Sequence, residues 1–383
     1  MSTIKVNKIE NTATTNGGVA IDSSGHLTLD GIPFPASGPL SHRNLLINGE
    51  MMIDQRNVGG TSTSGQWPVD HWQLGFTFPG TSIAVSAQQS SDAPEGFMKS
   101  VFLNVATNGA IAANQAWDFQ QWIEADNMAH LMFGTANAKD VTLSFYVKCS
   151  TAGTYSAILL NHTPNRCHVK EWTISNAEVN TWVRKVITFP GDTGGTWQTG
   201  NGRGLGVRFG FTCGDDFDAQ LDTWVASNPT GGPNQTNLST ISGGNVRLTG
   251  IQLEVGNMAT PYEHRFKQDE LRQCQRYYEK RKIFAGSLSQ MVCVTGYGGA
   301  SAMPPSVNFH VTKRAAPSIA YIQSGVTNYF HSTANSWIQN GGLAHWSSDE
   351  DWVHSYVAVN SSGIGFLVRA NTGASYVEAT SEL

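Results

Sequence analysis

The stretch Val141-Thr142-Leu143-Ser144-Phe145-Tyr146-Val147-Lys148 decides the fold class, because apolar and polar side chains alternate along it. A period of two is typical of a β-strand that buries one face. Leu205–Phe211 alternates in the same way, and Trp182–Phe189 is rich in strand-forming residues. Glycine- and proline-rich turns separate these runs, and helical periods are almost absent. The pattern predicts an all-β protein built as a sandwich or barrel.

One strand carries a second signal. In Val246–Val255 the alternation shifts by one residue at Gly250. A β-bulge at this glycine inserts one extra residue into the strand. The bulge would keep the five apolar residues of the segment on one face.

The chain of 383 residues is long enough for several domains. Residues 41–266 are predicted to form one large β-sandwich. Residues 1–40 hold short β runs around Ser23-Ser24-Gly25, which predict a hairpin, followed by a Pro- and Gly-rich linker at 32–40. This segment is too small to bury a core, so we expect it to pair with copies of itself or with another protein.

A single segment predicts a helix. Residues 269–281 lack Gly and Pro, and Leu271, Cys274 and Tyr278 recur at helical spacing. We expect a short connecting helix within residues 267–282. Residues 283–383 return to strand patterns and are predicted to form a separate C-terminal β domain.

Composition excludes several classes of function. Charged residues make up 14%, the net charge is −5, and no long Lys/Arg run is present, so we expect no nucleic-acid partner. No apolar run approaches the roughly 18 residues of a membrane span, and no signal peptide is seen, so neither membrane insertion nor secretion is expected. The five cysteines are an odd number without a CxxC, which favours buried free thiols made in a reducing cytosol. A polar, weakly charged surface suits neutral sugars.

Motifs for catalysis are absent from the sequence: there is no Gly-Lys pair, no GxSxG and no HExxH. We therefore expect no enzyme and no cofactor. Asp216, Asp218 and Asp222 would share one face if the segment were extended, and oxygen ligands so placed could hold structural calcium. The segment lacks the Gly and the closing Glu of an EF-hand, so a solvated acidic strand or turn is favoured and calcium is the alternative.

Aromatic residues fall into two groups. Trp72, Trp172 and Trp182 stand beside apolar partners and are predicted to lie in the core. In the last hundred residues, aromatic and polar side chains are interspersed. Aromatic faces with adjacent polar groups match the C–H faces and hydroxyls of sugars, although core packing is the alternative for each residue. The candidate carbohydrate-binding residues are Tyr329, Trp337, His345, Trp346, Asp349 and Trp352.

The stretch Asn44-Leu45-Leu46-Ile47-Asn48-Gly49-Glu50-Met51-Met52-Ile53-Asp54-Gln55-Arg56 resembles the opening of a domain found in many bacteriophage tail fibre and minor tail proteins. The match continues, in order, through residues 70–72, 121–124, 143–148, 180–182, 249–256, 259–265 and 274–279. Residues 313–317 and 378–383 resemble the C-terminus of the same proteins. His71 stands where the family pattern has Arg, and the acidic run 215–222 stands where relatives have Ser and Thr.

This resemblance implies a jelly-roll sandwich of the carbohydrate-binding-module type in a homotrimeric virion fibre. Residues 1–40 would dock to a tail or baseplate protein, and the C-terminal domain would bind host surface polysaccharide. Two alternatives stay open. One is a purely structural tail or baseplate component without receptor contact. The other is a polysaccharide depolymerase, which would need paired carboxylates in a groove.

Overall fold

The chain is described from a computed structural model. The structure describes residues 8–10, 18–21, 27–29, 32–33, 41–63, 65–162, 166–285, 291–294, 306–323, 328–332, 337–339, 344–348, 352–356, 366–370 and 374–383. After Arg281, side chains are described for residues 309–320 and 378–383. The chain divides into two compact units, Met1–Lys267 and Gln268–Leu383.

Short antiparallel strands form the N-terminal segment. They are β1 (Lys8–Glu10), β2 (Gly18–Ile21), β3 (Leu27–Leu29) and β4 (Ile32–Pro33), paired in that order. Ile21 is the register partner of Leu27, which confirms the predicted hairpin. β4 takes up the start of the predicted linker. The rest of the linker and the strand pattern at residues 3–7 lie outside the described residues.

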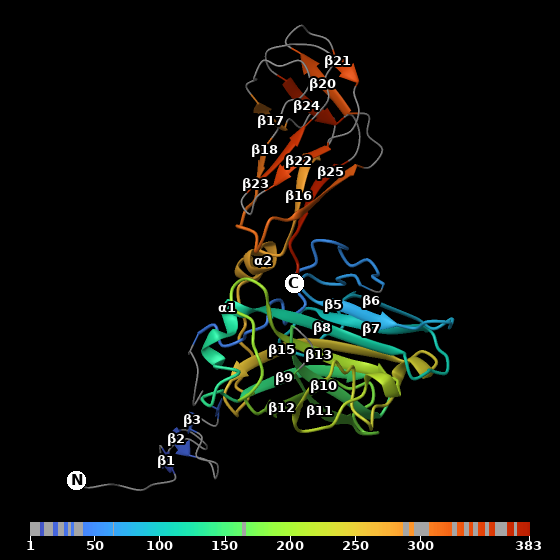
Figure 1. The fold of residues 1–383 in the computed structure, drawn as a ribbon, viewed down its shortest axis with the longest axis vertical. Helices are drawn as coiled ribbons and strands as arrows, with labels where there is room; N and C mark the ends of the chain where they lie inside the picture. Colours follow the sequence, from blue (N-terminus) through green and yellow to red (C-terminus); the bar gives the residue numbers. More distant parts are fainter. Residues whose placement is uncertain are drawn as a thin grey trace, which may run out of the picture. The chain divides into compact units, whose positions relative to one another are not determined.

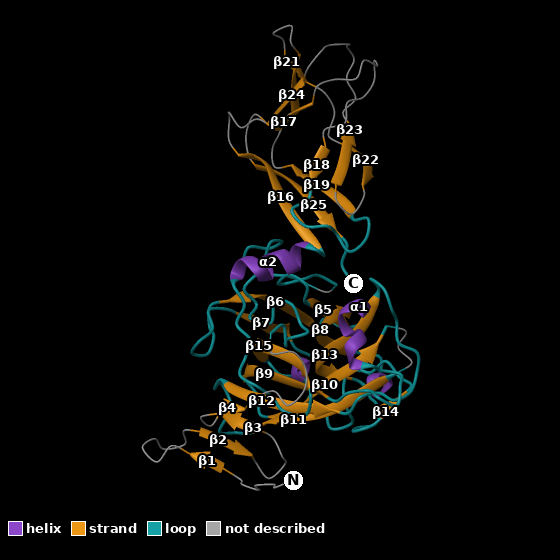
Figure 2. Cartoon of the chain, turned by 90° about the vertical axis from the view of Figure 1, so that its left-hand side faces the viewer, coloured by secondary structure: helices purple, strands orange, loops and turns teal. Residues whose placement is uncertain are grey.

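Two antiparallel sheets make up the body of the first unit (Figures 1 and 2). Within residues 41–267 as described, one sheet has the order β14 (Trp224–Val225), β11 (Cys167–Ile174), β10 (Gly153–Asn161), β13 (Arg203–Cys213), β8 (Ala116–Glu124), β5 (Gln73–Thr77). The other has the order β12 (Val183–Phe189), β9 (Val141–Cys149), β15 (Asn245–Val255), β7 (Ser100–Thr107), β6 (Ala84–Ser90). The chain crosses repeatedly between the sheets, and the predicted jelly-roll β-sandwich is confirmed.

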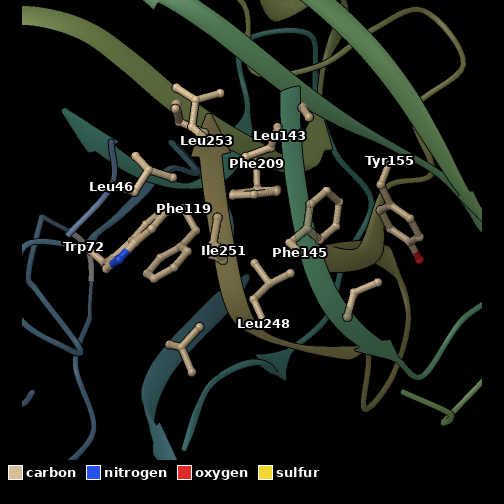
Figure 3. Packing of buried hydrophobic residues seen from close by; sticks show 14 of the residues in the cluster. Leu46, Trp72, Phe119, Leu143, Phe145, Tyr155, Phe209, Leu248, Ile251 and Leu253 are labelled. Carbon is tan, nitrogen blue, oxygen red and sulfur yellow. The ribbon is translucent and has the colours of Figure 1, made fainter. Parts of the chain in front are cut away.

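Side chains from the inner faces of both sheets form one core (Figure 3). Trp72 stacks on Phe119 with ring centroids 5.0 Å apart, and Phe145 meets Phe209 edge to face at 4.9 Å. All four side chains are fully buried. Large aromatic side chains dominate the burial of apolar surface. The Phe145–Phe209 contact joins β9 of one sheet to β13 of the other, and Trp72, just before β5, packs on β8 of the six-stranded sheet.

The predicted bulge in β15 is confirmed. Its pairing with β9 shifts register between Thr249 and Gln252, and Gly250 has a φ of +58°. The five apolar residues of this strand all lie in the core: Val246, Leu248, Ile251, Leu253 and Val255. A left-handed backbone is the conformation that glycine adopts without strain, which explains glycine at this position.

The motif at residues 44–56 is structural. Asn44 Oδ1 accepts hydrogen bonds from the backbone amides of Leu46 at 3.0 Å and Leu253 at 3.1 Å. Asn48 Nδ2 donates to the carbonyl oxygen of Asp70 at 2.9 Å. These asparagines satisfy backbone groups of the connecting segment. Asn44 thereby fixes the incoming chain to β15, and Asn48 joins it to the backbone at Asp70.

The predicted connecting helix exists but is shorter than expected. α2 spans Lys267–Gln275, and β16 (Tyr278–Ala285) begins where the helix was expected to continue. Tyr277 and Tyr278 are buried at 1% and 2% exposure, and Tyr278 is the register partner of Thr380. Strand pairing and tyrosine burial outweigh helix propensity here. Among the described residues, no helix has the length and apolar character of a membrane span.

The second unit is built from strands after α2. Its described strands form three antiparallel sheets: β16, β25 (Ala374–Thr380) and β19 (Ser318–Gln323); β17 (Met291–Val294), β24 (Phe366–Ala370), β20 (Asn328–Ser332) and β21 (Trp337–Gln339); and β18 (Ser306–Asn308), β23 (Trp352–Tyr356) and β22 (Ala344–Ser348). The all-β prediction for the C-terminal part is confirmed. Strands β20, β21, β22 and β25 were not predicted.

Three sequence segments meet within this unit, and all three carry the family resemblance. They are residues 274–279, 313–317 and 378–383. The backbone amide of Arg314 donates to the carbonyl of Arg276 at 3.0 Å, and that of Ser381 donates to the carbonyl of Tyr277 at 2.8 Å. The motifs of the last hundred residues therefore hold the start and end of the unit together.

Candidate functional site

The candidate sugar-binding residues of the C-terminal unit lie on two hairpins. Tyr329 is on β20 and Trp337 is on the paired strand β21. His345 and Trp346 are on β22, which pairs with β23, where Trp352 lies. The two hairpins belong to different sheets. The side chains of these five residues are not described, and Asp349 lies outside the described residues.

The acidic run forms an exposed turn, as the favoured interpretation predicted, and not the extended segment that the alternative calcium site would need. Asp215–Phe217 forms a 3-10 turn, η2, in which successive side chains point in different directions. Asp222 Oδ1 accepts from Lys170 Nζ at 2.7 Å. Asp216 and Asp218 are exposed. Over the part of the chain that is described, no three carboxylate, histidine or cysteine side chains are grouped as a metal ion would need.

Another arrangement of aromatic and polar side chains crosses the outer face of the five-stranded sheet. Register places Gln88 of β6 opposite Phe102 of β7, Phe102 opposite Arg247 of β15, and Arg247 opposite Lys148 of β9. Trp182 lies one residue before β12. With Asp92 from the β6–β7 connection, these six residues form what we call the Asp92 row. Five strands at about 4.8 Å spacing make it roughly 19 Å long.

Asp92 connects the members of the row. Its Oδ2 lies 2.9 Å from Lys148 Nζ and 3.2 Å from Arg247 Nε, and its Oδ1 accepts from Trp182 Nε1 at 3.0 Å. The carboxylate is positioned by its own backbone, because Asp92 N donates to Ser90 Oγ and Asp92 O accepts from Ser100 Oγ. One acidic side chain thus fixes two cations and one indole.

The electrostatics of Asp92 reflect these contacts. Partial burial raises the pKa of Asp92. Hydrogen bonds from Lys148 and Trp182, with the charges of Lys148 and Arg247, outweigh burial and hold the pKa below its usual range. The carboxylate is therefore ionised at neutral pH.

The row also presents aromatic surface. The Arg247 guanidinium carbon lies 4.1 Å from the centroid of the Phe102 ring, a cation–π contact. Phe102 and Trp182 are half-buried, and the side chains of Lys148, Arg247 and Asp92 keep 25%, 21% and 38% of their exposure. Two aromatic side chains with carboxylate, ammonium, guanidinium and amide groups on one accessible face can contact both the C–H faces and the hydroxyls of a sugar chain.

The sequence held one signal for this row. In Val101-Phe102-Leu103-Asn104-Val105 the inward positions are apolar, and Phe102 is an apolar ring at an outward position. No local sequence pattern links Phe102 to Lys148 and Arg247, which lie about 45 and 145 positions further along the chain. Trp182 was predicted to lie in the core. That prediction is wrong, because its indole is half-buried and bonds Asp92 on the outer face.

A second aromatic group fills a structural role. Phe133, Trp197 and Trp224 meet with centroids 4.8–5.9 Å apart, and Trp197 Nε1 donates to Asp192 Oδ2 at 3.1 Å. Asp192 is fully buried and paired with Arg166. These contacts fix the loop after β12, which carries Asp192 and Trp197, to the sandwich.

Comparison with solved structures gives likenesses to two kinds of protein. A tailspike protein 4 enzymatically active domain of bacteriophage CBA120 matches 56% of this chain at 17% identity with a TM-score of 0.31. This chain spans 21% of that protein's length. No protein-family model and no curated protein sequence matches this chain.

Several other similar structures are carbohydrate-binding modules. A CBM4 structure matches 54% of this chain and 97% of its own length at 16% identity, with a TM-score of 0.28. A family 11 module from Clostridium thermocellum, solved with a β-1,3-1,4-mixed-linked tetrasaccharide, matches 50% and 91% at 12% identity, with a TM-score of 0.26. The glycan site proposed for this chain rests on its own side chains.

Proposed function

We propose that this chain is a non-catalytic glycan-binding protein of a bacteriophage tail fibre, and that it holds host surface polysaccharide against the Asp92 row. The observation that carries the proposal is the row itself. Phe102 and Trp182 supply apolar rings, and Asp92 fixes Lys148 and Arg247 beside them. Side chains held in place before binding lose little conformational freedom when a ligand arrives.

Assignment to a tail fibre is supported by the ordered motifs between residues 44 and 279. The N-terminal hairpin supports a partner for residues 1–40, because Ile9 and Ile21 are 63% and 49% exposed in the single chain. We propose that this segment docks to a tail or baseplate protein and that the fibre is a homotrimer in the virion. Three copies would convert weak sugar sites into firm attachment.

The C-terminal residues remain a second proposed contact. Tyr329, Trp337, His345, Trp346, Asp349 and Trp352 would bind the same polysaccharide from the C-terminal unit. Both surfaces are non-catalytic in this proposal. Release of new reducing ends from the polysaccharide by the purified full chain would contradict that part.

The test compares full-length variants for binding to intact host bacteria and to their extracted polysaccharide. Phe102→Ala and Trp182→Ala each remove an aromatic ring of the row, and each should weaken binding at least tenfold. Val186→Ala is the matched control, since Val186 is 51% exposed on β12 of the same sheet and lies outside the row. Unchanged binding in both row variants would overturn the site. No binding by the unsubstituted chain would favour a purely structural tail component.

A further inference from the structure

We infer that the Asp92 row recognises an acidic polysaccharide, one whose sugar units carry carboxylate groups. The inference rests on the proposed function and names its ligand class. Arg247 and Lys148 are register partners on adjacent strands, and both side chains lie on the outer face. Like charges placed directly opposite each other across a sheet are destabilising unless an anion lies between them.

Asp92 supplies one such anion, and one cation's charge is left over. The row holds two cations, Lys148 and Arg247, and one anion, Asp92, so its net local charge is +1. The chain as a whole is negative at −5. A local excess of positive charge on an acidic protein marks a place where a second anion would be stabilised. Glu95 is exposed in the same β6–β7 connection and has no described ion pair. Because water screens its charge, Glu95 offsets the positive charge of the row only in part.

Donors of both cations remain available. Lys148 Nζ makes a single described hydrogen bond, to Asp92, out of the three that an ammonium can donate. Arg247 donates from Nη1 to Asn245 Oδ1 at 3.2 Å, and its buried Nε faces Asp92, which leaves three of the five N–H groups of the guanidinium. A ligand carboxylate beside them would accept charge-assisted bonds, which are about twice as strong as neutral ones.

A neutral sugar would use these donors less well. Its hydroxyls would bond Lys148 and Arg247 without neutralising the excess charge. The cations are about three-quarters buried, at 25% and 21% exposure, so the local dielectric is lower than that of water and a ligand charge counts for more. The acidic sugar is therefore favoured over its neutral counterpart of the same shape.

The experiment uses the full chain and three polysaccharides: polygalacturonate, alginate and hyaluronate. Each is measured beside its carboxyl-reduced form, in which the acid has become a primary alcohol. The chain should bind at least one acidic form at least tenfold more tightly than its reduced form, and this preference should shrink as NaCl is raised. Lys148→Met and Arg247→Met should each reduce the preference severalfold.

Lys170→Met is the matched control. Lys170 has the same 25% exposure as Lys148 and also pairs with an aspartate, but it lies on the other sheet. Its substitution should leave the preference unchanged. Equal binding of acidic and reduced forms, or binding of reduced forms alone, would overturn the acidic-ligand inference and leave glycan binding standing. Binding to none of the six would also overturn the inference, while the host polysaccharide tests glycan binding separately.

Discussion

Lys313 Nζ lies 2.6 Å from Glu279 Oε2 inside the C-terminal unit, and neither side chain is more than 1% exposed. Lys313 also donates to the carbonyl oxygens of Gln275 at 2.6 Å and Val311 at 2.9 Å, so its three donors are all used. The other Glu279 oxygen faces His310. This buried pair joins two of the motif segments that carry the family resemblance.

Lys313→Met should destabilise the second unit by about 3–5 kcal/mol, because it leaves the Glu279 carboxylate buried without its main partner. Thermal and denaturant unfolding of the full chain would measure this loss. The double variant Lys313→Met/Glu279→Gln should recover part of the loss.

Lys280→Met is the control for this prediction. Lys280 pairs with Glu378 at 3.1 Å, and both side chains keep about a fifth of their exposure. A partly exposed pair contributes about 1 kcal/mol or less. Equal losses for the two lysine variants would show that burial of the Glu279 pair is not the source of stability.

Gly250→Ala should destabilise the sandwich by roughly 2–4 kcal/mol. The added Cβ would lie 2.8 Å from Phe97 Cζ, and the φ of +58° is strained for alanine. Gly243→Ala separates these causes, since Gly243 has a φ of +68° and open space around its Cβ position. Gly243→Ala should cost about 1 kcal/mol. A smaller loss for Gly250→Ala than for Gly243→Ala would contradict the claim that Phe97 crowds a Cβ added at the bulge.

His168 should make the sandwich less stable in acid. The side chain is fully buried against Phe189 and Trp224, and neither ring nitrogen has a described hydrogen-bond partner. Burial, aided by Lys170, lowers the pKa of His168 from 6.5 to about 4. The unfolded chain therefore binds a proton between these values that the folded chain does not. The stability that neutral, buried His168 contributes is fully present above pH 6.5. It is lost as the pH falls towards 4, which lowers the free energy of unfolding by up to about 3 kcal/mol.

Replacement of His168 tests this directly. His168→Phe keeps the ring contacts and removes the titrating group, and His168→Leu does so with a smaller side chain. Both should remove about 3 kcal/mol of the stability difference between pH 7 and pH 4, measured by denaturant unfolding. Retention of the full difference in both variants would contradict the role of His168.

Trp346→Ala and Trp352→Ala test the second proposed contact. Each should weaken binding to host cells severalfold while the oligomer mass, measured by light scattering, stays the same. A change in oligomer mass would point to packing between subunits, and unchanged cell binding in both would remove the C-terminal contact from the proposed function.

The sequence predicted the sandwich well because β-strand patterns are local. The alternation in Val141–Lys148 and the one-residue shift at Gly250 are visible along the chain and match β9 and β15. The helix boundary was missed because the pairing of Tyr278 with Thr380 joins residues about 100 positions apart. Tertiary contacts of that kind override local propensity.

The candidate site was less predictable for the same reason. The Asp92 row takes one residue from each of several strands that are distant in sequence, and Asp92 comes from a connection between strands. Strand register brings Arg247 and Lys148 side by side, and the path of the β6–β7 connection places Asp92 next to them and to the Trp182 indole. The aromatic residues of Tyr329–Trp352 were prominent in the sequence because they are close together along the chain.

The most direct test of the central claim is a titration of the full chain with polysaccharide extracted from its host. Four proteins would be compared: the unsubstituted chain, Phe102→Ala/Trp182→Ala, Trp346→Ala/Trp352→Ala, and Val186→Ala. We expect saturable binding that falls at least tenfold in the Phe102/Trp182 variant, severalfold in the Trp346/Trp352 variant and not at all in the Val186 variant, with all four proteins equally folded. Full affinity in the Phe102/Trp182 variant would contradict the claim that the Asp92 row holds the glycan.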